Sequence, residues 1–401
     1  MRGLAKIGIG ILIGLTAAGC ASGPQADRML HPDVLAKADL QYYWKLPLQL
    51  RGGESVVRLY LLDETLYCMT DRNRAIAVDA AMGRPLWSYD VAPAGEKVFP
   101  PCHAAEALLT EQAILPAAMR LPSDTPALER YAIVAFNTIR KAVVLNRATG
   151  AVLRELSFPF VANTGGATNG QSFFVGSGKG WCHAFSLMEG VSMWDVSTDD
   201  MLASAPKCYL GLVYLAGQDG YFYCFDSSQK PRRVFRQTMQ GPVTAEIHVS
   251  ERGCYVPSED FRLYAYEPGA GTKLWEPFVC QGPLRQAVQV SSNTVYQYAE
   301  GDRFYAINLV DGQKRWDTAQ GRLVLAAMEG NAYVLTAGRD LRIVNEILGT
   351  VKHSLPMTGW ELFAPNTHAP AIYVATADGQ LACIRLLGAG HLTPDMIRGP
   401  R

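Results

Sequence analysis

Cysteine and histidine are the residue types in this chain that could form disulfides, bind metal or take part in acid, base and nucleophilic chemistry. The chain holds nine cysteines and seven histidines. The histidines are scattered singly and show no metal-site spacing: His31, His103, His183, His248, His353, His368 and His391. Haem-attachment, zinc-helix, Walker and nucleophile-elbow motifs are absent. We read the glycine-rich run 176–180 as a hairpin turn, because no helical pattern follows it.

Cys20 ends a segment with the pattern of an export signal. A basic start precedes an apolar run over residues 7–15, which is too short for a permanent membrane span. The pattern resembles the bacterial lipoprotein signal peptide, which implies that residues 1–19 are removed and that Cys20 carries acyl chains, palmitate among them. Aspartate after the cysteine would imply retention at the inner membrane, and Ala21 stands there instead. The resemblance therefore implies the periplasmic face of the outer membrane.

From residue 40 onward the chain repeats one unit. In the copy from Thr294 to Trp316, two strand patterns meet at a tight turn, and a second turn at Asp311-Gly312 leads into a third strand. A bulky apolar residue marks each copy at intervals near 40 residues: Tyr67, Val134, Phe174, Tyr214, Tyr255, Tyr296, Tyr333 and Tyr373. A single hairpin cannot bury both faces, so the copies must stack.

Eight such copies predict an all-β fold, an eight-bladed β-propeller with four-stranded blades. The chain ends favour a closed ring over a solenoid. The last copy runs out of strand after Leu387, while Leu40–Leu48 offers a strand with no hairpin before it. We predict that this N-terminal strand completes the eighth blade and closes the ring. The predicted organisation is a signal peptide (1–19), a lipid-anchored linker (20–39), the propeller (40–388) and a C-terminal tail (389–401).

Tryptophans and glycines recur at fixed positions in the copies. A glycine often lies sixteen residues after the bulky apolar position, and a tryptophan often lies four residues later. The tryptophans of this kind, including the one in the N-terminal strand, are Trp44, Trp87, Trp194, Trp275 and Trp316. We predict that they pack between neighbouring blades and carry no chemistry.

Eight cysteines remain besides Cys20, and an even number in an exported protein favours disulfides. However, Cys224 and Cys383 occupy the strand position that holds Ala265 and Ala306 in other copies, which is typical of a small buried residue. We expect buried thiols together with one or two disulfides of unassigned connectivity.

One copy breaks the period. Between Trp87 and Gly150 the chain carries about 26 residues more than the repeat needs. Two strand-like runs, Ala113–Leu121 and Tyr131–Asn137, flank a polar segment that would form an extra hairpin or a long loop. Insertions in repeat proteins often lie on the functional face. We predict partner contact through this segment, at Pro122, Asp124, Pro126, Leu128 and Arg130.

The repeat pattern V-Y-x-x-x-x-x-G-x-L-Y-A-x-D-x-x-x-G-x-x-x-W occurs with variations in Val213–Asp226, Cys254–Trp275 and Thr294–Trp316. It resembles the PQQ-type β-propeller repeat family. With the signal segment and eight copies, the chain is similar to the lipoprotein subunits of outer-membrane β-barrel assembly machineries. This resemblance covers Leu40–Leu387 and implies a non-enzymatic scaffold that binds envelope proteins, the barrel insertase among them. The repeat residues specify geometry and not a partner.

Quinoprotein dehydrogenases share this repeat, which makes a redox enzyme the alternative. That resemblance implies pyrroloquinoline quinone and Ca²⁺ in the central funnel, beneath a disulfide between adjacent cysteines. The chain has no adjacent cysteine pair and no acidic cluster typical of calcium binding. We therefore expect a protein that is not an enzyme and uses no cofactor. Its 37 basic and 37 acidic residues give no overall field that would favour nucleic acid.

Overall fold

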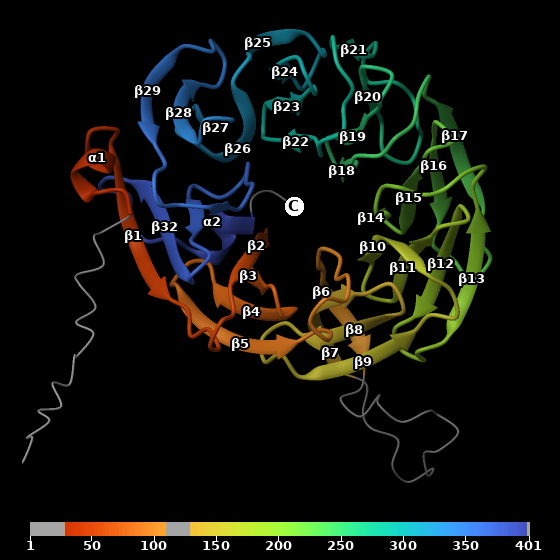
Figure 1. The fold of residues 1–401 in the computed structure, drawn as a ribbon. Helices are drawn as coiled ribbons and strands as arrows, with labels where there is room; N and C mark the ends of the chain where they lie inside the picture. The colour runs from red at the N-terminus through yellow and green to blue at the C-terminus, as the bar shows by residue number, and fades with distance from the viewer. Residues whose placement is uncertain (1–28, 110–128, 399–401) are drawn as a thin grey trace, which may run out of the picture.

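The chain folds into a ring of blades. The computed structural model describes residues 29–109 and 129–398, and within these residues eight four-stranded antiparallel sheets follow one another around the ring (Figure 1). In seven sheets the strands pair in sequence order, and in the eighth the first strand of the chain joins the last three. The eight-bladed propeller predicted from the repeats is confirmed.

The first four blades span the first half of the chain. Blade 1 contains β2 (Val56–Leu62), β3 (Thr65–Thr70), β4 (Arg74–Asp79) and β5 (Arg84–Asp90). Blade 2 contains β6 (Cys102–Leu109), β7 (Glu129–Asn137), β8 (Lys141–Asn146) and β9 (Val152–Ser157). Blade 3 contains β10 (Ala162–Thr168), β11 (Ser172–Ser177), β12 (Trp181–Ser186) and β13 (Ser192–Ser197). Blade 4 contains β14 (Lys207–Tyr209), β15 (Leu212–Ala216), β16 (Tyr221–Asp226) and β17 (Arg233–Thr238).

The other four blades complete the ring. Blade 5 contains β18 (His248–Ser250), β19 (Gly253–Pro257), β20 (Arg262–Tyr266) and β21 (Phe278–Val279). Blade 6 contains β22 (Gln289–Val290), β23 (Thr294–Tyr298), β24 (Phe304–Asn308) and β25 (Lys314–Thr318). Blade 7 contains β26 (Gly321–Met328), β27 (Asn331–Thr336), β28 (Asp340–Asn345) and β29 (Val351–Pro356). Blade 8 contains β30 (Leu362–Phe363), β31 (Ile372–Ala375), β32 (Gln380–Leu386) and β1 (Leu40–Pro47).

The core lies between the blades. The second strands of blades 1 and 3, β3 and β11, are buried along their whole length, because a neighbouring blade covers each face. The bulky apolar positions that mark the repeat all fall on second strands and are buried. The outer fourth strands instead alternate between exposed and partly buried residues, as in β5, which is typical of a strand with one face in solvent.

Adjacent blades are joined by an aromatic ring that lies on a glycine. Gly349, in the turn after β28, has φ +72°, and a Cβ there would lie 2.5 Å from the Trp316 side chain of the preceding blade. The Trp316 indole N–H also donates to the Glu346 carbonyl in the same turn, at 2.9 Å. Five seams pair a ring with a glycine in this way: Trp44 with Gly83, Trp87 with Gly150, Phe235 with Gly271, Trp275 with Gly312, and Trp316 with Gly349. We call this contact the ring-on-glycine seam.

Two of the predicted tryptophans depart from this pattern. Blade 4 has Lys230 in place of the glycine, and the Trp194 indole N–H is buried without a hydrogen-bond partner among the described residues. Trp275 lies on Gly312 but precedes its strand, because β21 begins only after Pro277, which cannot donate a ladder hydrogen bond. Both side chains are nevertheless buried, without the indole hydrogen bond.

The N-terminal strand closes the ring as predicted. β1 pairs antiparallel with β32, from Leu40 opposite Leu386 to Pro47 opposite Gln380. On the other side of the seam, the Trp44 indole N–H donates to the Ala80 carbonyl of blade 1 at 3.1 Å.

Both ends of the described chain lie on one face of the ring. We define the entry face by the turns between first and second strands and between third and fourth strands, and the far face by the turns between second and third strands. Near the start of the chain, the Asp39 carbonyl accepts a hydrogen bond from Leu387 N in such a turn. Near its end, Arg398 pairs with Glu64 in another, at 2.7 Å.

A short helix adjoins each end. Helix α1 (Pro32–Ala36) precedes β1, and Leu35 packs into the core between blades 7 and 8. Helix α2 (Pro394–Arg398) follows blade 8, and Ile397 is buried against blades 8 and 1. No helix in the described ranges is long and apolar enough to cross a membrane.

The extra chain falls between β6 and β7. The predicted run Tyr131–Asn137 belongs to β7, the regular second strand of blade 2. The run Ala113–Leu121 and four predicted contact residues, Pro122, Asp124, Pro126 and Leu128, lie outside the described residues. Arg130 is described: it is exposed in β7 and pairs with Glu106 of β6 at 2.7 Å.

The expectation of one or two disulfides is wrong for the described chain. The eight cysteines other than Cys20 are free, and six of them are buried. They sit as small side chains on different strands, with Cys280 directly after β21, and burial raises the pKa of Cys68, for example, to about 12. Such thiols behave as apolar core residues.

The ring-on-glycine seam can be tested with two glycines of nearly equal backbone conformation. Gly349 and Gly330 have φ +72° and +70°, but a Cβ at Gly330 meets nothing within 4 Å. We expect Gly330→Ala to lower the free energy of unfolding by about 1 kcal/mol from backbone strain, and Gly349→Ala to lower it by about 1–3 kcal/mol more through overpacking. Urea unfolding followed by tryptophan fluorescence measures both.

The same substitution in a Trp316→Ala background provides the control. Without the indole, Gly349→Ala should lower the free energy of unfolding by about as much as Gly330→Ala does. If Gly349→Ala lowers it as much in that background as in the parent protein, the contact with Trp316 is not the cause of the destabilisation.

Candidate functional site

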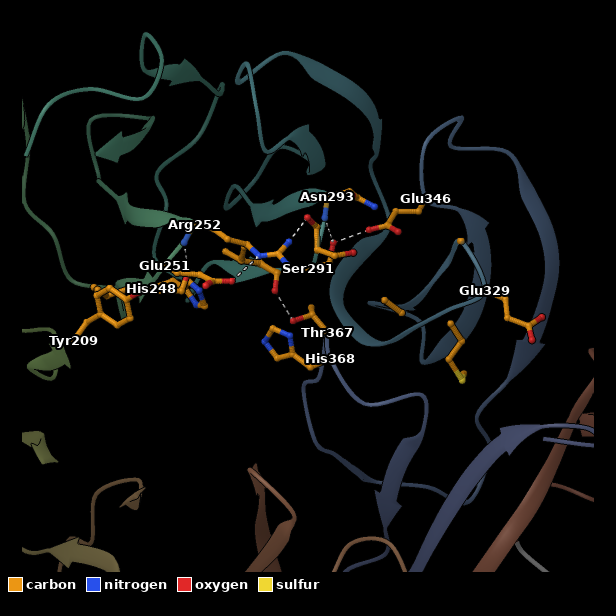
Figure 2. A pocket seen from close by; sticks show the side chains of 17 residues that line it. Tyr209, His248, Glu251, Arg252, Ser291, Asn293, Glu329, Glu346, Thr367 and His368 are labelled. Atoms are coloured by element: carbon orange, nitrogen blue, oxygen red, sulfur yellow. Dashed lines mark hydrogen bonds and ion pairs between the residues drawn. The ribbon is translucent and has the colours of Figure 1, made fainter. Parts of the chain in front are cut away.

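A cavity of about 560 Å³ opens toward the ring centre on the entry face. It is lined by residues of blades 4 to 8, mainly the inner strands and the turns that follow them (Figure 2). Tyr209 comes from blade 4, His248 and Arg252 from blade 5, and His368 from blade 8. We call this cavity the funnel pocket. Its residues lie up to about 160 positions apart in the chain and meet only because the ring is closed.

Glu346 fixes one wall of the funnel pocket. Its side-chain oxygen Oε1 accepts hydrogen bonds from Ser291 Oγ at 2.6 Å and from the Tyr296 hydroxyl at 3.0 Å. Burial, with the Glu346 carboxylate beside it, raises the pKa of Tyr296. Glu346 is itself buried, so the carboxylate joins blades 6 and 7 and has little freedom to act on a ligand.

Two histidines face the funnel pocket from blades 5 and 8. His248 lies on β18 and His368 in the turn between β30 and β31, and their rings lie in the same part of the pocket (Figure 2). Burial, then His368 and Lys207 nearby, lowers the pKa of His248 to about 3. Burial and Arg252 lower the pKa of His368. Both rings are therefore neutral at pH 7 and can donate and accept hydrogen bonds.

Cross-blade hydrogen bonds hold the rim of the funnel pocket. The Arg252 guanidinium donates to the Ser292 carbonyl, from blade 5 to blade 6. The Thr367 hydroxyl donates to the Val290 carbonyl at 2.6 Å, from blade 8 to blade 6. Such bonds fix the turns, so the rim is a preformed surface.

The funnel pocket suits a neutral or zwitterionic polar group with an apolar part. Arg252 supplies positive charge, Glu251 and Glu329 supply negative charge, and Val249 and Met328 add apolar surface. No three His, Cys, Asp or Glu side chains within the described residues are grouped to hold a metal ion. A Ca²⁺ ion needs several convergent oxygen ligands. The described residues therefore offer no acidic cluster for the calcium ion of quinoprotein dehydrogenases, and we derive no reaction through that ion or its quinone.

A second constellation has the hydrogen bonds of a catalytic triad. Ser177 Oγ lies 3.0 Å from His183 Nε2, and His183 Nδ1 lies 2.6 Å from Asp195 Oδ1. However, Ser177 is only 5% exposed, and the Phe160 ring stacks on His183 with centroids 3.6 Å apart. A nucleophile needs access to a substrate carbonyl. The three residues therefore act as a tie across β11, β12 and β13.

The sequence predicted little of this pocket. Its two histidines, His248 and His368, are among the seven that are scattered singly along the sequence. Of the residues proposed for partner contact, Arg130 does not line the funnel pocket, and the other four lie, like Cys20, outside the described residues. A sequence signal exists only for Glu346, which stands three residues before a repeat glycine.

Comparison with known proteins identifies the type of propeller. Residues 229–387 match the family model described as outer membrane protein assembly factor BamB, and these residues run from the end of blade 4 through blade 8. No curated protein sequence matches the chain.

Solved structures agree with this match. The crystal structure of BamB from Moraxella catarrhalis has a TM-score of 0.62 and 15% sequence identity, and the alignment covers 88% of this chain and 99% of that one. The computationally designed Ika8 protein has a TM-score of 0.59 and 12% identity, with 84% and 98% covered. At these identities the likeness shows the fold.

The neutral state of His248 predicts a pH dependence of stability. In the unfolded chain a histidine takes up a proton near pH 6.5, whereas in the folded protein His248 does so only near pH 3. Between these values the unfolded state binds more protons, so the free energy of unfolding falls as the pH falls, by up to about 1.4 kcal/mol per pH unit.

We expect His248→Gln to flatten this slope between pH 6.5 and pH 4. The exposed His353 provides the control, since His353→Gln should leave the slope of the parent protein unchanged. Urea midpoints at several pH values measure it. If the slope is unchanged in His248→Gln, the folded protein does not hold His248 neutral over this pH range.

Proposed function

We propose that this chain, a β-propeller of PQQ-like repeats with a BamB-like fold, is a lipid-anchored scaffold of the cell envelope that takes part in outer-membrane β-barrel assembly. The observation that carries the proposal is the match to BamB. The family match covers residues 229–387, and the alignment to the Moraxella protein takes in 99% of that structure. A fold alone does not determine a function, so the site and the anchor must support it as well.

The funnel pocket supports binding more than catalysis. Its carboxylate at Glu346 and its guanidinium at Arg252 are engaged in bonds between blades. Its two histidines are uncharged and come from blades on different sides of the pocket. A rigid, partly apolar cavity ringed by fixed turns is suited to receive a side chain or loop of a partner protein.

The anchor is the second support. Cys20 follows an apolar run and small residues, and an acylated N-terminal cysteine would hold the propeller at a membrane more durably than one acyl chain could. The described chain begins nine residues later, at Met29, on the entry face. The protein would then work at the periplasmic side of the outer membrane.

Cross-linking and mass spectrometry of intact envelopes test the assembly role. We expect cross-links from the propeller to the barrel insertase. A Glu346→Ala variant, which loosens the pocket wall, should reduce them, whereas Glu189→Ala, an exposed residue in a turn of blade 3, should not. Envelopes that yield other partners but no insertase component would contradict the role.

The same purified protein can be titrated with pyrroloquinoline quinone and Ca²⁺. Saturable binding together with substrate-dependent dye reduction would support the quinoprotein alternative instead.

Acylation at Cys20 predicts the behaviour of one variant. We expect the parent protein to incorporate labelled palmitate and to fractionate with membranes, and Cys20→Ser to lose both properties. Cys68→Ser serves as the control, because that buried cysteine lies in β3, and it should keep the label. Label retained in Cys20→Ser would exclude this cysteine as the acylation site.

A further inference from the structure

Apolar side chains are exposed at turn tips on one part of the entry face. They lie in the turns that follow the third strands of three consecutive blades, 6, 7 and 8. Their exposed fractions are high: Val310 80%, Leu348 71%, Leu387 57% and Ile347 50%. We call these four residues the apolar arc. Scattered exposed apolar residues are normal, but four on adjacent turns form a patch that calls for a partner.

The turns hold the arc outward. Asn308 Oδ1 accepts a hydrogen bond from Val310 N at 3.2 Å, and Asn345 Oδ1 accepts one from Leu348 N at 2.8 Å. Beneath the tips of blades 6 and 7, the turn glycines Gly312 and Gly349 bear the rings of Trp275 and Trp316 from the neighbouring blades. The backbone of these turns is therefore fixed, and the tips cannot fold back into the core. Because the turns are already ordered, little backbone freedom would be lost when the tips bind a partner.

The matching turns of the other blades differ from one another. In blades 2 and 4 the tips are Ala148-Thr149 and Ser228-Gln229, which are small or polar. Blades 1 and 3 expose Met82 (51%) and Met188 (45%) there, and the turn between the first two strands of blade 4 exposes Leu210 (80%). On the far face, the turns are rich in charged residues and glycine, as at Asp71-Arg72, Gly178-Lys179, Asp219-Gly220, Gly338-Arg339 and Asp378-Gly379. The apolar arc is thus the part of the entry face where three consecutive blades each expose a branched aliphatic side chain in the turn after the third strand.

The chain enters the ring at the same edge. Leu387, a member of the arc, donates its backbone N–H to the Asp39 carbonyl at 2.7 Å. Helix α1 and Leu30 pack against blade 7 beside it, and the described chain begins there (Figure 1). From Met29 back to Cys20 is nine residues, which span at most about 30 Å.

We propose that the apolar arc rests on the lipid bilayer that receives the Cys20 acyl chains, so that blades 6 to 8 touch the membrane and blades 2 to 4 lean away from it. This inference rests on the proposed function, because it requires the anchor. A lipid surface is favoured over a protein partner because the short linker begins beside this edge and therefore holds it nearest to the membrane. In this orientation the far face stays open to proteins.

The contact would act as a second attachment beside the acyl chains. Each aliphatic tip entering the acyl boundary would raise partitioning by a few-fold. None of the four residues is charged, so this contribution should persist at high salt, where attraction between a basic surface and anionic lipid would be screened.

Depth-dependent quenching tests the proposal on the full acylated protein. The protein is reconstituted in phosphatidylethanolamine and phosphatidylglycerol vesicles that contain brominated lipid, with a polarity-sensitive dye on an introduced cysteine. We expect strong quenching at Leu348→Cys, little at Lys179→Cys on the far face, and intermediate or weak quenching at Gln229→Cys on blade 4. Protein without an added cysteine gives the background from the natural thiols.

A triple variant tests the strength of the contact. We expect Val310→Ser, Leu348→Ser and Leu387→Ser together to speed transfer of the acylated protein between vesicles about tenfold or more, equally in 0.1 M and 1 M salt. The control is Val234→Ser with Val279→Ser, which replaces exposed valines on the outer strands of blades 4 and 5, and it should have no effect.

The outcomes separate the two proposals. If the acylated protein binds vesicles but the dye is quenched equally at positions 348 and 179, the orientation is wrong and the anchor stands. If position 348 is shielded only when envelope proteins are added, a protein covers the arc and the proposal is overturned. If the parent protein does not bind vesicles at all, the anchor itself fails.

Discussion

The architecture depends on an aromatic ring that lies on a glycine in the next blade. Only a residue without a Cβ allows the indole of Trp316 to approach the backbone at Gly349, and the indole N–H then satisfies the carbonyl of Glu346. Each contact buries a large apolar area and fixes the angle between two sheets. Because the contact recurs around the ring, it sets the positions of the turns on the entry face, and these turns carry both the funnel pocket and the apolar arc.

Much of this could be predicted from the sequence, because the repeat keeps its columns in register. The exceptions have a local cause. In blade 4, Val234 stands twenty residues after Tyr214, where other copies have tryptophan. However, Phe235 is the residue whose ring lies on Gly271. The turn before β17 is one residue longer than elsewhere: Asp226 N bonds to Arg232 O, whereas Asn308 N bonds to Gln313 O. Counting residues at the fixed spacing of the repeat cannot detect a turn that is one residue longer.

The pocket and the thiols could not be predicted for a different reason. His248 and His368 meet only through ring closure, and sequence spacing carries no information about which inner strands face each other across a pocket. The prediction of disulfides was wrong because it used only the even number of cysteines. It did not take into account where the strands place each thiol. Residues such as Cys224 and Cys383 fill alanine positions in separate blades, so packing explains them.

The pairing of β1 with β32 has a consequence for the order in which the molecule is made. Leu40 lies opposite Leu386, so β1, the first strand of the ring to be synthesised, is the last to find its partner. Until nearly the whole chain has been made, β1 keeps an open edge, and blade 8 lacks its outer strand. An open edge is prone to pair with other chains, and distant pairings form slowly. A newly made chain of this design therefore passes through a period in which it is prone to aggregate, and that period ends only when the ring closes.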